Sequence, residues 1–233
     1  MSIKKYMRDR VEKESLIDEV KDILLDGSPK ELSKYRKFGL ESVHGFMKLL
    51  LSLGNTAFNS GDPQVIERFM RALCELTVSG VLDKDTYLGR IQHYGLRTIH
   101  GFDYDSFTVI LDRFLDYIYG LKDTDSVITC LKVLKRFSRG VISEGYEAGM
   151  IKLVDIFAEL DEFFEVEGKR VNRFYLRNVV ISMVYFAGSD GNDSLRKRLV
   201  IALMDASSDG LIGLGENSPV YSDIKMVPLS EKA

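Results

Sequence analysis

Residue types that carry out catalysis or bind metals are sparse in this sequence, and their spacing is unfavourable. His44, His93 and His100 are its only histidines. His93 and His100 lie seven residues apart, which on a helix is about 10.5 Å along the axis, too far to share one metal ion. No Cys-x-x-Cys or His-x-x-x-His spacing completes a zinc site. We therefore predict neither a metal site nor a bound cofactor.

Nucleophiles and paired carboxylates give no clearer signal. Cys74 and Cys130 lie on or beside apolar helix stripes, where cysteine behaves as a small inert hydrophobe. The acidic pairs Asp161-Glu162 and Glu165 with Glu167 lie in a polar stretch that we interpret as a solvated turn between two helices. No catalytic set converges, so we expect a protein that is not an enzyme.

Two glycine-containing segments invite a ligand-loop interpretation. The cluster at 210–215 follows a helix rather than a strand and lacks a following Lys-Ser/Thr, so it matches neither phosphate-loop fingerprint. The segment 189–194 lacks the alternation and final glutamate of a calcium loop. We predict turns at both places.

The elements that position these residues are helices almost throughout. Apolar residues recur with the 3.6-residue period, and the pairs Ser28-Pro29 and Asp62-Pro63 are typical helix starts. No strand-like alternation persists. The sequence predicts an all-α protein with helices over 15–25, 30–47, 48–60, 63–79, 86–101, 104–121, 124–139, 146–164, 171–188 and 193–208.

An internal repeat organises these helices. The segment FGLESVHGF (38–46) returns 56 residues later as YGLRTIHGF (94–102), with five of nine positions identical. Helices that end near Gly80, Gly140 and Gly210 suggest a second correspondence. We interpret the chain as about three imperfect three-helix repeats over 28–82, 83–142 and 143–212.

Repeats of this kind resemble, in outline, armadillo and HEAT proteins. That resemblance implies a right-handed α-α superhelix, or solenoid, although the period exceeds the about 40–47 residues usual there. A duplicated globular helical bundle is the alternative. Residues 1–212 would form a single domain, with 1–27 as an N-terminal cap and 213–233 as an extended or disordered tail.

Composition excludes several classes. With 45% apolar residues, 32 Lys or Arg against 35 Asp or Glu, and two distant cysteines, the chain resembles neither a disordered nor a disulfide-rich protein. The longest apolar stretch is too short to cross a bilayer, and no signal core follows the N-terminus. We expect a cytoplasmic protein.

Basic residues on the third helix of each repeat are the best functional lead. If equivalent helices align in a solenoid, these residues form one positive stripe, although a solvated face is the plainer interpretation. The leading hypothesis is a non-enzymatic scaffold that binds another protein. A nucleic-acid-binding protein is the alternative, and homo-oligomerisation through the tail is a further expectation. The candidate residues are Arg68, Arg71, Lys132, Lys135, Arg136, Arg139, Arg196, Lys197 and Arg198.

Overall fold

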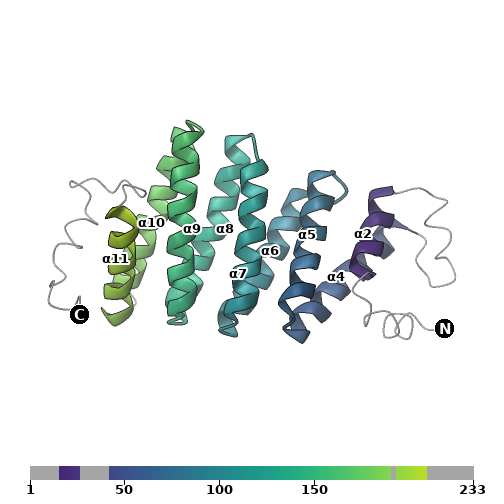
Figure 1. Ribbon diagram of the computed structural model, residues 1–233, viewed down its shortest axis with the longest axis horizontal. Coiled ribbons are helices and arrows are strands. Elements are labelled where there is room, and N and C mark those ends of the chain that lie inside the picture. The colour runs from purple at the N-terminus through teal and green to yellow at the C-terminus, as the bar shows by residue number, and fades with distance from the viewer. Residues whose placement is uncertain (1–15, 27–41, 190–192, 209–233) are drawn as a thin grey trace. The chain divides into compact units, whose positions relative to one another are not determined.

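The computed structural model describes residues 16–26, 42–189 and 193–208, and every regular element within them is an α-helix (Figure 1). The prediction of an all-α protein is therefore confirmed. No helix in these ranges is long and apolar enough to cross a membrane. The helices are α2 (Leu16–Asp26), α4 (Val43–Ser60), α5 (Pro63–Val78), α6 (Lys84–His100), α7 (Tyr104–Gly120), α8 (Thr124–Ser143), α9 (Glu147–Val166), α10 (Arg170–Ser189) and α11 (Asp193–Ser208).

Aspartate caps begin several of these helices. Oδ1 of Asp62 accepts a hydrogen bond from the backbone N–H of Gln64 at 2.9 Å, and Pro63 takes the first helical position, as predicted. Asp103 and Asp123 cap α7 and α8 in the same way. Each cap satisfies backbone donors that the first turn of a helix leaves unpaired.

The chain divides into two compact units, Met1–Tyr94 and Gly95–Ala233, with the boundary inside α6. In unit 1 the helices α2, α4 and α5 pack on one another. Tyr94 contributes an aromatic core: its ring stacks on Phe58 at 4.2 Å and meets Phe69 edge-on at 5.6 Å. Gly54 makes room for this cluster, because a Cβ there would overlap the Phe69 ring.

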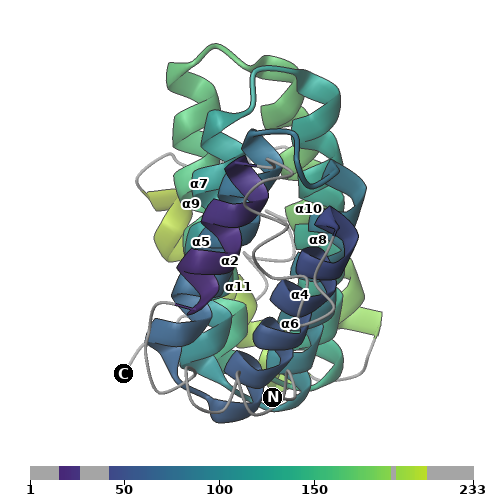
Figure 2. The same ribbon diagram turned by 90° about the vertical axis from the view of Figure 1, so that its right-hand side faces the viewer.

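Unit 2 has two layers of helices. In one layer α9 packs between α7 and α11, and in the other α8 packs beside α10. Figure 2 shows these two sets as separate columns. Contacts of α9 with α8 and α10 join the layers, and the buried rings of Phe107, Phe114, Phe137, Phe157 and Phe164 fill unit 2.

Two expectations about local structure are wrong. Helix α4 runs without interruption across the break predicted between 47 and 48. Gly140 does not end α8, which continues to Ser143; Gly145, with φ 65°, follows its C-terminus. The two copies of the nine-residue motif also differ: His44 lies in the first turn of α4, whereas His100 is the last residue of α6.

Several predictions concern residues outside the described ranges. These are residues 1–15 of the expected N-terminal cap, the start signal at Ser28-Pro29, most of the expected helix 30–47, the glycine cluster at 210–215 and the tail 213–233. Oligomerisation through that tail stays a prediction.

Candidate functional surface

The nine predicted basic residues lie on three helices. Arg68 and Arg71 lie on α5 in unit 1, where Arg68 is 3.8 Å from a carboxylate oxygen of Asp18. In unit 2, four lie on α8 and three on α11. Because α8 packs beside α10 while α11 packs beside α9, these two groups belong to different layers. Arg198 of α11 pairs with Glu147 of α9.

Helix α8 gathers its basic residues on one face. Lys132, Lys135, Arg136 and Arg139 follow the i, i+3, i+4, i+7 spacing that places side chains along one side of a helix. Lys135 is partly buried and the other three are exposed. No Asp or Glu occurs between 126 and 143, so this part of the helix sequence contributes only positive charges.

Helix α10 adds exposed apolar side chains that the sequence analysis missed. Val171, Phe174 and Tyr185 are 62%, 68% and 57% exposed. Their spacing of three and eleven residues keeps them on one side, away from the buried Leu176 and Val180. Large apolar groups exposed on one side of a helix can form part of an interaction surface. The helix contains no acidic residue.

The two stripes belong to neighbouring helices. α8 and α10 pack side by side, and the guanidinium carbon of Arg139 lies 5.8 Å from the centre of the Phe186 ring of α10, a distance at which a cation is attracted to an aromatic face. We call this the α8–α10 surface, defined by Lys132, Lys135, Arg136, Arg139, Val171, Phe174 and Tyr185.

Two pairs of helices in unit 2 differ in charge. Helices α8 and α10 together contain seven Lys or Arg and one Asp, whereas α7 and α9 contain nine Asp or Glu and two basic residues. Both of those basic residues are paired with carboxylates, Lys152 with Asp112 at 2.9 Å and Arg113 with Asp116 at 2.7 Å. The pair α8 and α10 is therefore net basic and the pair α7 and α9 net acidic, while α11, in the layer of α9, adds Arg196, Lys197 and Arg198.

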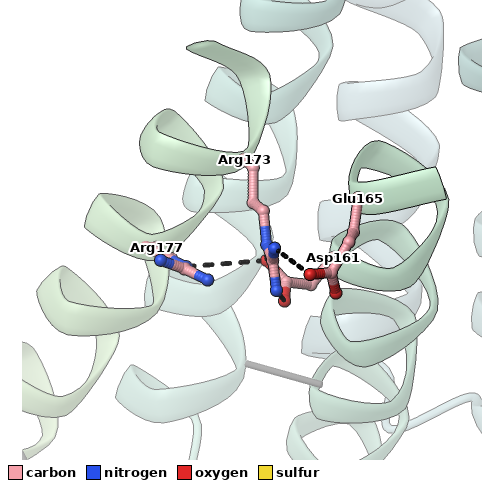
Figure 3. Close-up of polar contacts among 4 residues, drawn as sticks. All are labelled: Asp161, Glu165, Arg173 and Arg177. Atoms are coloured by element: carbon pink, nitrogen blue, oxygen red, sulfur yellow. Dashed lines mark hydrogen bonds and ion pairs between the residues drawn. The ribbon is translucent and has the colours of Figure 1, made fainter. Parts of the chain in front are cut away.

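A buried ion pair fixes α10 on α9 (Figure 3). Nε and Nη2 of Arg173 donate to the two carboxylate oxygens of Asp161, both at 2.8 Å, and Nη1 lies 2.7 Å from Glu165. Nε of Arg177 is 3.7 Å from Asp161. The hydrogen bonds to Asp161 raise the pKa of the Arg173 guanidinium above its ordinary value. This bidentate contact sets the position of α10 and hence of its exposed stripe.

The position of Asp161 corrects the sequence interpretation. We expected a solvated turn, but Asp161 lies within α9 with its side chain only 1% exposed. Its partner Arg173 lies on the next helix, twelve residues further along the chain. This ion pair offsets the free-energy cost of burying the carboxylate. Glu162, its neighbour in the sequence, is exposed.

Histidines and cysteines do not gather into a site within the described ranges. No group of three or more His, Cys, Asp or Glu is placed to hold a metal ion there. His100 contacts Glu144 through Nδ1 at 2.7 Å on the surface. Cys130 is buried and Cys74 is partly buried. In the part of the chain that is described, the α8–α10 surface is the strongest candidate for function.

Comparison with known proteins finds no match to a family model, to a curated protein or to a solved structure.

Proposed function

We propose that this protein is a non-enzymatic helical-repeat adaptor that binds another protein through the α8–α10 surface. The observation that carries the proposal is the row of exposed apolar side chains on α10 beside the basic stripe of α8. Apolar anchors surrounded by polar groups are the common pattern of protein interfaces. The charges favour a partner with acidic residues around apolar ones.

The proposed framework is a solenoid of the armadillo or HEAT kind. Support comes from unit 2, where successive helices alternate between two layers. A compact globular bundle of this length has a radius of gyration of about 17.5 Å, and an elongated stack of repeats gives a larger value. Small-angle scattering distinguishes the two, and a value near that of the compact bundle would favour the duplicated bundle.

Site-specific crosslinking tests the proposed interface. A photo-crosslinking amino acid at Phe174 should capture a partner protein, while the same amino acid at Gln64, exposed on α5 in unit 1, should not. Lys132→Glu with Arg136→Glu should abolish the capture at Phe174, since they reverse two charges of the surface. Equal capture at both positions, or capture unaffected by charge reversal, would contradict the proposal.

A nucleic-acid backbone is the second candidate partner, favoured by the uninterrupted basic stripe of α8. Binding to duplex or single strands would then weaken steeply with salt. Replacing Lys132, Lys135 and Arg136 by Glu would abolish it, whereas Phe174→Ser would leave a phosphate contact largely intact. A requirement for Phe174 in partner binding would favour the protein interface instead.

A further inference from the structure

Unit 2 carries a second stripe of exposed residues, on α9. Ile151 and Val166, which are 42% and 78% exposed, lie at its ends. The exposed carboxylates of Asp155 and Glu162 lie between them. The spacing of 4, 7 and 4 residues keeps all four on one side of the helix. We call these four residues the α9 stripe. It combines apolar and charged groups as the α8–α10 surface does, with the opposite charge.

We propose that the α9 stripe of a second copy of this chain binds the α8–α10 surface. The inference rests on the proposed function, because it names a partner for that same surface. A protein surface with acidic groups between apolar ones is what the basic and apolar α8–α10 surface would accept. This chain itself supplies such a surface.

The spacing of the two stripes matches. Asp155 and Glu162 are seven residues apart, as are Lys132 and Arg139, so each pair spans about 10.5 Å along its helix. The apolar ends also correspond: Ile151 and Val166 are about 22 Å apart along α9. Val171 and Tyr185 are about 21 Å apart along α10. The charged pairs and the apolar ends therefore have matching lengths along their helices.

The two stripes cannot meet within one unit. They lie on exposed faces of helices that belong to opposite layers, and the layers pack together through α8, α9 and α10. The contact is therefore between copies, and it joins two different surfaces. Such a heterologous contact leaves one unused surface of each kind at the two ends, so copies add in a chain unless the arrangement closes into a ring.

The area of the proposed contact is smaller than that of a standard stable interface. A helix of 20 residues is about 30 Å long. Two neighbouring helices, each about 10 Å wide, present a face that is about 20 Å wide and has an area of about 600 Å². This is below the roughly 800 Å² per partner of a standard stable interface. We therefore expect weak association, with charge contributing a large share of the specificity.

Sedimentation velocity of the nuclease-treated full chain tests the inference. The average mass should rise with protein concentration. Raising the salt from about 0.1 M to about 1 M shortens the screening length from about 10 Å to about 3 Å, and the association constant should fall at least about tenfold. A mass that stays monomeric at every concentration and salt would overturn the inference. So would association that disappears on nuclease treatment, because it would assign the surface to nucleic acid.

Charge reversal gives the decisive comparison. Lys132→Glu with Arg136→Glu makes both surfaces acidic, and Asp155→Lys with Glu162→Lys makes both basic, so neither double variant should self-associate. Mixed together they present opposite charges again, and the mixture should associate. The control, Arg71→Glu with Lys122→Glu, changes two exposed residues outside both stripes by the same charge and should leave self-association unchanged.

Restoration in the mixture also shows that both variants are folded. Unchanged circular dichroism of each variant together with no association of the mixture would overturn the inference. Its failure is distinguishable from failure of the proposed function. A chain that never self-associates, but is crosslinked through Phe174 to a different protein, would retain the interface with another occupant.

Discussion

The carboxylate of Asp161 shows how much a single buried charge depends on its partner. Its side chain is 1% exposed, and both of its oxygens accept hydrogen bonds from Arg173. Asp161→Asn removes the negative charge and leaves an arginine only 18% exposed at that contact. We expect the free energy of unfolding to fall by about 3 kcal/mol, measured by urea denaturation.

The neighbouring Glu162 provides a control at the adjacent position, because it is exposed. Glu162→Gln should change the free energy of unfolding by less than about 0.5 kcal/mol. Equal effects of the two substitutions would show that the buried pair with Arg173 contributes little.

The buried phenol of Tyr146 makes the folded protein less stable at alkaline pH. Its hydroxyl is buried with no hydrogen-bond partner among the described residues, and burial raises the pKa of this phenol to about 12. Above its ordinary pKa of about 10 the unfolded chain loses this proton while the folded chain keeps it, so stability falls as the pH rises toward 12.

Tyr146→Phe should remove this contribution. Near pH 7 we expect a change within about 0.5 kcal/mol, because no hydrogen bond is lost. Between pH 9 and pH 11 the original protein should lose about 1 kcal/mol more than the variant. Urea denaturation at each pH measures both, and parallel pH profiles would contradict the assigned pKa.

At the scale of the element, two glycines of α6 have opposite roles. Nothing lies within 4 Å of a Cβ at Gly89, whereas a Cβ at Gly95 would overlap the ring of Phe137 from α8. Gly89→Ala should stabilise by about 0.5–1 kcal/mol through helix propensity. Gly95→Ala should destabilise by about 1–2 kcal/mol because overpacking exceeds that gain.

A smaller side chain facing Gly95 separates packing from propensity. Phe137→Leu frees part of the space that the new methyl group needs, so Gly95→Ala should cost less in that background than in the original protein. Thermal denaturation of the four proteins gives the coupling between the two sites. Additive effects would mean that the ring does not limit the position.

The helices themselves were predictable because their periodicity and caps are local. The predicted 104–121 and 193–208 correspond closely to α7 and α11. What failed depends on tertiary contacts. Gly140 resembled a helix end, but its missing side chain lets Leu96 and Ile99 of α6 pack closely, and α8 continues past it. Sequence alone does not distinguish a glycine that ends a helix from a glycine that lets a neighbouring helix pack closely.

The candidate surface was predictable only in its charge. The i, i+3, i+4, i+7 spacing from Lys132 to Arg139 is visible in the sequence. The exposed stripe of α10 was missed because that helix is apolar on both sides, so its period does not say which side is buried. Pairing of Arg173 with Asp161 orients the helix and leaves Phe174 exposed. This contact joins residues on two different helices, so no local sequence motif indicates it.

At the scale of the whole molecule, each of the two units has buried residues of its own, and we expect damage to one unit to stay within it. The ring cluster of unit 1 depends on Gly54, and the attachment of α10 in unit 2 depends on Asp161. Parts of a structure can open separately, so stability can vary along a chain. Gly54→Ala should therefore speed amide exchange in α4 and α5, and Asp161→Asn in α9 and α10.

Hydrogen exchange followed by mass spectrometry tests this prediction. It compares the amide exchange rate of peptides from each helix between each variant and the original protein. Helix α6 is the most informative element, because the boundary between the units falls after Tyr94. Its residues 84–94 should respond to Gly54→Ala and its residues 95–100 to Asp161→Asn. Equal acceleration of all helices by either substitution would instead show one cooperative unit, since local destabilisation would then open the whole chain at once.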